Sequence, residues 1–184
     1  MNLAFDEVKA TQAAAALLCL AGGELNHLAL IKLLYRADRE ALRRWGSPVT
    51  TDKYVSMKYG PVTSRIYDRI KSSANAAAPA TFWSTHIQRK DPYLVRLQSD
   101  PGLSELSRAE EELLREIFDE HGHKDAFKLA EETHREFPEW KDPGKGSSPI
   151  ELADIFDATG MTEEEIEHAM AQIRAQWALL ELAS

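Results

Sequence analysis

The residues of this chain best suited to chemistry are two histidines of the segment HGH, His121 and His123, with His134 one predicted helix further on. Imidazoles can ligate a metal, but no cysteine or third fixed ligand accompanies them, so we expect them to cap a helix end or face solvent. Cys19 lies in the apolar run 13–21, a position typical of a buried, inert thiol rather than a nucleophile. Phosphate-binding loops, nucleophile elbows and zinc-protease motifs do not occur in the sequence. We therefore predict that the protein is not an enzyme and uses no metal or cofactor.

The net charge of the chain, −8, is unevenly distributed. Residues 1–71 carry 11 Lys and Arg against 7 Asp and Glu, whereas residues 72–184 carry 11 against 23. A nucleic-acid-binding protein usually presents a coherent basic face, which only the first part can supply, so we do not expect nucleic acid as the main partner. The longest apolar run is about half a membrane span, and Asp6 and Glu7 follow the start too closely for a leader. We expect a cytoplasmic protein with no membrane partner.

Helices must position most of the functional side chains, and the helix predicted over 24–45 is the most informative. At about 100° per residue, one arc of this helix is apolar and is predicted to face the core. The residues of this arc are Leu30, Ile31, Leu34, Ala37, Ala41, Leu42 and Trp45. The opposite side carries a basic stripe, which is either a solvated face or a surface for phosphate or for an acidic protein. The stripe consists of Lys32, Arg36, Arg39 and Arg43.

Asp38 departs from this division, because it projects into the apolar arc between Ile31 and Trp45. A carboxylate directed towards apolar neighbours needs a hydrogen-bond or charge partner. We predict a structural polar role for Asp38 in a buried network, with a functional contact as the alternative. Asp52 is assigned the same structural role.

The remaining elements complete a mainly α fold, which we expect to be a compact single-domain helical bundle with a small β-hairpin insertion. The hairpin is predicted near 81–98, from two β-prone runs around a turn at 89–92. Capping boxes are predicted at Ser107 with Glu110, Ser148 with Glu151, and Thr162 with Glu165. Helices are predicted over 6–21, 52–58, 61–72, 107–120, 124–135, 149–157 and 162–182.

The segment YGPV, residues 59–62, interrupts this helical pattern. Gly60 permits a backbone angle or a close approach that a Cβ would obstruct, and Pro61 suits the first turn of a helix. We therefore predict a tight helix–turn–helix corner here. Val62 is expected to be buried beside Ile66, whereas Tyr59 lies outside either apolar arc and is expected to bind a partner.

These residues also resemble a known family, the Panacea domain of SocA-like antitoxins. The resemblance covers roughly residues 8–145 and rests on four motifs in a fixed order. They are KLLY with Asp38 at 32–38; Gly46, Pro48, Asp52 and Tyr54; YGPV at 59–62; and Thr133 and His134 followed by Trp140.

The resemblance implies an antitoxin that neutralises a cognate protein toxin by direct binding, with members thought to act on unrelated toxins. It also implies a second mechanism, a proteolytic adaptor that delivers the toxin to an ATP-dependent protease. A nucleic-acid-binding regulator that uses the basic stripe is the alternative. We expect a Panacea-like domain at 1–145 and a helical extension at 146–184 packed on it. The predicted partner-binding residues are Lys32, Tyr35, Arg36, Arg39, Tyr54, Lys58, Tyr59, Gly60, Pro61, His134 and Trp140.

Overall fold

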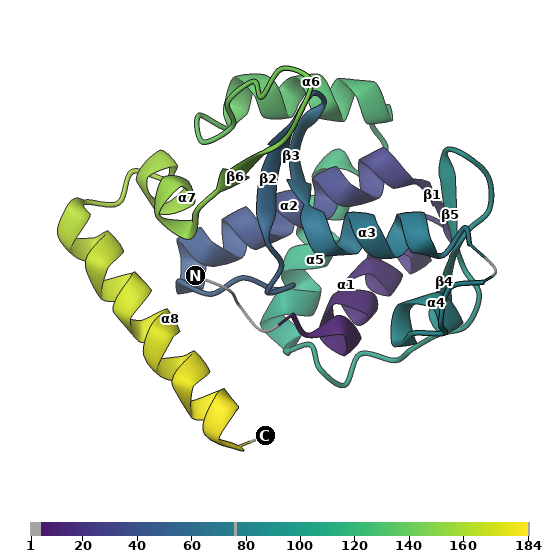
Figure 1. Ribbon diagram of the computed structural model, residues 1–184, viewed down its shortest axis with the longest axis horizontal. Coiled ribbons are helices and arrows are strands. Elements are labelled where there is room, and N and C mark those ends of the chain that lie inside the picture. Colours follow the sequence, from purple (N-terminus) through teal and green to yellow (C-terminus); the bar gives the residue numbers. More distant parts are fainter. Residues whose placement is uncertain (1–4, 76, 184) are drawn as a thin grey trace.

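The computed structural model of the protein describes residues 5–75 and 77–183. Over these residues the chain forms eight helices and two three-stranded antiparallel sheets, so the prediction of a mainly α protein is confirmed (Figure 1). The helices are α1 (Glu7–Leu20), α2 (His27–Trp45), α3 (Ser64–Ser72), α4 (Phe82–His86), α5 (Arg108–His121), α6 (Ala126–Glu136), α7 (Leu152–Ala158) and α8 (Glu163–Ala183). The strands are β1 (Glu24–Asn26), β2 (Tyr54–Met57), β3 (Gly60–Thr63), β4 (Ile87–Arg89), β5 (Leu94–Leu97) and β6 (Ser148–Ile150). Their orders are β1-β5-β4 and β3-β2-β6.

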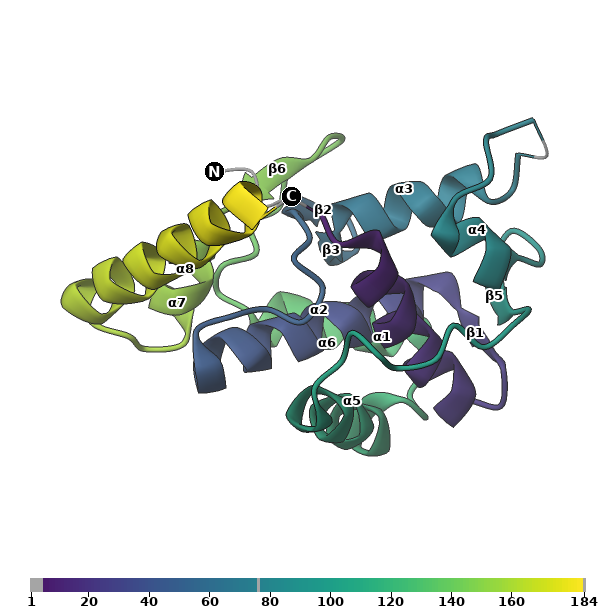
Figure 2. The ribbon, with the colours of Figure 1, turned by 90° about the horizontal axis from the view of Figure 1, so that it is seen from below.

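Helix α2 lies at the centre of the fold, with α1, α5 and α6 packed against it (Figure 2). The Asn26 side chain caps its start by accepting the N–H of Leu28 at 2.9 Å. Gly46 ends it in the left-handed conformation, with φ 70°, where glycine carries no Cβ penalty. This central place explains why residues 29–38 are all buried, whatever their polarity.

The prediction that the basic stripe of this helix is exposed is therefore wrong for two of its four residues. Lys32 is 0 % exposed and Arg36 is 6 % exposed, because α6 and β3 pack over them. Arg43, in the last turn, does face solvent. The apolar arc is buried as predicted except at its end, where Trp45 is 43 % exposed.

The segment predicted as a short helix over 52–58 is instead the strand β2, and YGPV forms the turn and second strand of a β-hairpin. Tyr54 pairs with Thr63 and Met57 with Gly60. Tyr54 and Val55 favour a strand, and Gly60 has a φ of 94°, which a hairpin turn requires. Pro61 lies in the edge strand β3, where its missing N–H is tolerated. Helix α3 consequently begins three residues later than predicted, at Ser64.

The hairpin predicted near 81–98 is confirmed as β4 and β5, with two additions. Residues 82–86 form the short helix α4, which the Thr81 side chain caps. The strand β1, predicted as the first turn of the 24–45 helix, pairs with β5 as the third strand of this sheet. Gly22 and Gly23, both with positive φ, lie in the turn between α1 and this strand.

The later helices agree with the predictions, apart from α7. The capping boxes at Ser107 and Thr162 are present, each with its glutamate bonded back to the cap. The box predicted at Ser148 is wrong, because residues 148–150 pair with β2 as the strand β6. Helix α7 begins instead at Leu152, and Glu151 and Asp154 form its box.

Among the described residues, the two largest apolar clusters join most of these elements. The larger joins α1, α2 and α5 and includes the fully buried Trp83. The smaller joins Tyr35, Tyr54 and Phe137 to apolar residues of α7 and α8, so the C-terminal helices contact the rest of the fold. Its C-terminal members are Leu152, Ile155, Phe156, Ala169 and Ile173.

Cys19 corrects a further expectation, because its side chain is exposed rather than buried. Local desolvation and, secondly, the charge of Asp100 nevertheless raise the pKa of this thiol, which disfavours the nucleophilic thiolate. Within residues 5–75 and 77–183, no helix is both long and apolar enough to cross a membrane.

Two buried carboxylates connect the hairpin to the helices on either side of it. Asp38 on α2 is 0 % exposed and accepts hydrogen bonds from the N–H of Thr50 at 2.8 Å, the Thr50 hydroxyl, and the Tyr54 hydroxyl at 2.9 Å. Burial raises the pKa of Asp38 to about 7, against the opposing effect of these donors. Asp38 thus occupies the buried network predicted from its position in the apolar arc.

Asp52 plays a corresponding part at the start of α3. Its carboxylate accepts the N–H groups of Arg65 at 2.9 Å and Ile66 at 3.0 Å, which lack partners within the helix. The N-cap residue Thr63 makes no side-chain bond of its own. Asp52 therefore caps α3 from the preceding loop, and burial raises its pKa to about 6.

We expect Asp38→Ala to lower the free energy of unfolding by about 1–3 kcal/mol for each buried donor left unpaired. Asp38→Asn keeps one acceptor oxygen and should fall between Asp38→Ala and wild type. Asp68→Ala is the matched control, because Asp68 forms a solvent-exposed pair with Lys71. Urea denaturation at pH 8 measures all three, and an Asp38→Ala protein as stable as Asp68→Ala would contradict the structural role.

Candidate functional site

The turn of the β2–β3 hairpin is enclosed by side chains from α2 and α6. A Cβ at Gly60 would collide with the Thr133 hydroxyl and would lie 3.0 Å from the Lys32 ammonium nitrogen. It would also lie 3.4 Å from the His134 ring. Gly60 is therefore required twice, by its positive φ and by this close approach.

Lys32 reaches the hairpin from α2 through the interior. Its Nζ donates to the carbonyl of Pro61 at 2.6 Å, and the whole side chain is 0 % exposed. Burial and, secondly, the charge of Arg36 lower its pKa from 10.5 to about 7. The amine therefore exchanges its proton near physiological pH, and it donates a hydrogen bond in either protonation state.

His134 and Trp140 close the other side of the turn. Their rings are stacked, with centroids 3.9 Å apart and an interplanar angle of 12°. The indole N–H of Trp140 donates to the Met57 carbonyl at 2.9 Å. Burial and, secondly, the charge of Lys32 lower the pKa of His134, so its ring is mostly neutral near pH 7. The motif residues from three distant segments therefore meet at one hairpin.

Arg36 and Arg39 of α2 are held by carboxylates rather than open to solvent. Arg36 pairs with Glu132 at 3.4 Å and with Glu136 at 2.9 Å. Arg39 donates from Nε to Glu139 at 2.8 Å, and both guanidinium groups lie over the ring of Phe137. These carboxylates on and after α6 explain how a basic stripe can be packed against a neighbouring helix.

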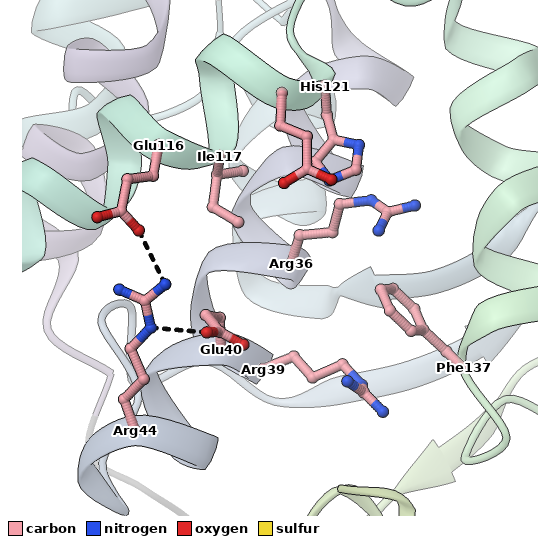
Figure 3. Close-up of a pocket in the computed structure, with 9 residues that line it drawn as sticks. Arg36, Arg39, Glu40, Arg44, Glu116, Ile117, His121 and Phe137 are labelled. Atoms are coloured by element: carbon pink, nitrogen blue, oxygen red, sulfur yellow. Dashed lines mark hydrogen bonds and ion pairs between the residues drawn. The ribbon is translucent and has the colours of Figure 1, made fainter.

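A small hollow between α2 and α5 is also lined by paired arginine and glutamate side chains (Figure 3). Arg44 lies between Glu40 and Glu116 and pairs with both, at 2.6 and 2.8 Å. Tyr35, deeper in the fold, donates its hydroxyl to Glu139 at 3.0 Å. The sequence analysis did not predict a role for Glu139, because the only indication in the sequence is its position next to Trp140.

The histidines considered as metal ligands have other contacts. His121 Nδ1 lies 2.9 Å from the Lys124 Nζ, and the His123 ring packs edge-on against Phe118. Within the part of the chain that the structure describes, no three His, Cys, Asp or Glu side chains are grouped for a metal.

Beside the hairpin turn lies a hollow of about 440 Å³ that we call the aromatic groove. Its lining is Asn26, His27, Leu28, Ile31, Met57, Lys58, Tyr59, Val62, Tyr67, Tyr93 and Phe127. The rings of Tyr59 and Phe127 meet edge to face, with centroids 6.0 Å apart. Tyr59 is 48 % exposed, Tyr93 66 % and Phe127 62 %. The groove is therefore an exposed apolar surface formed by the turn, the start of α2, α6 and the β4–β5 connection.

The predicted partner-binding residues divide by exposure. Lys58 and Tyr59 are exposed and line the groove, and Arg39, His134 and Trp140 are half-buried. The others are buried, so any effect they have on a partner must act through the position of the elements that they hold together. They are Lys32, Tyr35, Arg36, Tyr54, Gly60 and Pro61. Phe127 and Tyr93 were not predicted, because single apolar residues at the start of a helix and in a turn carry no motif.

We expect Gly60→Ala to destabilise the protein far more than Gly102→Ala. Both glycines have positive φ, 94° and 72°, so both changes strain the backbone. Only at Gly60 does the new Cβ collide with Thr133, whereas Gly102 faces open space. Thermal melting should show a drop of several degrees more for Gly60→Ala, and equal drops would mean that the close approach does not matter.

Lys32 gives a prediction about pH. Since its pKa is lowered in the folded state, the unfolded chain binds more protons between pH 7 and 10.5. The contribution of Lys32 to the free energy of unfolding should therefore rise over that pH range, by at most about 1.4 kcal/mol per pH unit. We expect the free energy of unfolding of wild type to rise relative to Lys32→Met between pH 7 and 9. Lys53→Met, at an exposed position, is the control, and parallel curves for Lys32→Met and wild type would contradict a buried amine of low pKa.

Comparison with family models gives a match that spans these features. The model described as the antitoxin SocA-like, Panacea domain matches residues 30–141. Comparison with curated proteins finds no match, and comparison with solved structures finds none. The matched residues include most of α2, the whole β2–β3 hairpin and the stacked pair His134 and Trp140. Since the match covers more than half of the chain, the protein belongs to the SocA-like antitoxin family with a Panacea domain.

Proposed function

We propose that this protein is the antitoxin of a toxin–antitoxin pair and neutralises its cognate protein toxin by direct binding. Family membership supports the antitoxin role. The observation that supports binding is the aromatic groove, since large apolar side chains gathered on a surface mark sites of protein association. Tyrosine and phenylalanine at such a surface bury much area with few rotatable bonds.

The alternative of a nucleic-acid-binding regulator depended on an open basic face of α2. Lys32 and Arg36 are buried, and Arg39 and Arg43 are paired with Glu139 and Glu40. Phosphate contacts require accessible Lys and Arg side chains, so these residues no longer support that alternative. The family favours a binding protein over an enzyme.

Co-expression with the protein encoded by the adjacent gene tests the proposal. We expect that protein alone to arrest growth, and co-expression with this chain to restore growth and give a complex that co-purifies. Toxicity that persists beside abundant folded antitoxin would contradict the proposal. The adaptor mechanism remains a prediction, and the half-life of the toxin separates it from masking, because only delivery to a protease shortens that half-life.

Two substitutions on one hairpin separate binding from folding. Tyr59 is half exposed, so Tyr59→Ala should leave the melting temperature nearly unchanged and weaken the toxin complex at least about tenfold. Val62 is 5 % exposed, so Val62→Ala should cost about 1–3 kcal/mol of stability through lost burial and a cavity. Calorimetry of binding and of unfolding measures both. A Tyr59→Ala protein that melts several degrees lower yet binds toxin normally would show that the turn serves folding alone.

A further inference from the structure

The exposed apolar side chains of the protein are concentrated at one place. Among the described residues, five large apolar side chains are exposed, and three of them line the aromatic groove: Tyr59, Tyr93 and Phe127. They come from three segments that are remote in sequence, and their rings form the rim. Beneath them, the half-buried or buried side chains of Leu28, Ile31, Met57, Val62 and Tyr67 form the floor. The groove is therefore apolar in its depth as well as at its edge.

The groove is held by contacts that do not depend on a partner. The N–H of His27 donates to the Tyr93 carbonyl at 2.8 Å, and its Nδ1 lies 3.0 Å from the same oxygen. Asp125 accepts the N–H of Phe127 at 2.9 Å and so caps α6 where the ring projects. A surface preformed in this way loses little conformational freedom when it binds.

The charge of the lining is opposite in sign to that of the protein. The chain carries 30 Asp and Glu, but the groove is lined by none of them, and Lys58 is its one formally charged residue. Asp91 and Asp125, each two residues from a lining ring, accept backbone N–H groups, and Asp68, next to Tyr67, pairs with Lys71. Lys58 lies over the ring of Tyr59 at 5.3 Å, and the described residues offer it no ion pair. Its ammonium is thus available beside an apolar hollow.

We infer, on the basis of the proposed function, that the aromatic groove receives an amphipathic segment of the toxin. An apolar side chain of that segment enters between Tyr59 and Phe127, and a neighbouring carboxylate pairs with Lys58. The volume of about 440 Å³ is in the range of pockets that hold compact apolar groups. The chain as a whole carries a net charge of −8 and therefore repels an acidic segment. The positive charge of Lys58 favours the approach of such a segment to the groove.

The test measures binding of the co-purifying toxin to wild type and to two groove variants, Phe127→Ala and Lys58→Glu. Trp45→Ala is the control for loss of an exposed aromatic ring, and Lys53→Glu reverses an exposed charge at the other end of β2. We expect Phe127→Ala to raise the dissociation constant of the toxin complex at least about tenfold. Lys58→Glu should slow association several-fold and flatten its dependence on salt. The two controls should stay within about twofold of wild type, and all variants should melt like wild type.

The outcomes separate this inference from the function on which it rests. A wild-type protein that does not bind the toxin overturns the proposed function. Normal binding by Phe127→Ala, with wild-type protein binding well, overturns the groove as the docking site while the antitoxin role stands. If Lys58→Glu and Lys53→Glu change the association rate equally, the inferred pairing of Lys58 with a carboxylate of the toxin is wrong. Wild-type dimers that form without toxin and disappear in Phe127→Ala would show a second copy in the groove, which also overturns the inference.

Discussion

The hydrogen bond from the buried Lys32 amine to the Pro61 carbonyl joins the centre of the fold to the hairpin that carries the surface. An ammonium with no access to water is costly unless it has partners or loses its proton. Lys32 meets this constraint with one carbonyl and a pKa lowered to about 7. A shifted hairpin would remove that carbonyl and leave the amine unpaired. The cost of burying Lys32 thus becomes a restraint on where the hairpin lies.

The other polar groups of α2 act in the same way on other elements. Asp38 needs the Thr50 and Tyr54 donors, which lie in the loop before β2 and on β2. Arg36 and Arg39 need carboxylates on and after α6. Each interaction contributes modestly to net stability, but each unpaired alternative is expensive. The buried polar groups therefore select one arrangement of helices, loop and hairpin among those that would bury a similar apolar area.

The limits of sequence reasoning follow from the same interactions. Helices with strong caps, such as the one opened by Ser107 and Glu110, are determined locally and were predicted within two residues. The burial of the basic stripe was not predicted, because helical periodicity records polarity and not burial. The carboxylates that pair with Arg36 and Arg39 lie about 100 residues away in sequence. The strand β2 was missed because four residues carry little periodic signal and their pairing with β6 is remote. Phe127 and Tyr93 belong to the groove only through the tertiary fold.

This division between buried motif and exposed groove bears on how the protein recognises a partner. Lys32, Gly60 and Pro61 define the hairpin but offer a partner no surface. Lys58, Phe127 and Tyr93 offer surface but make few of the contacts that define the fold. Groups of the second kind can change in size or charge without leaving a buried donor unpaired, so their substitution alters affinity before stability. A scaffold with this separation can keep its hairpin while the exposed surface beside it changes in shape and charge.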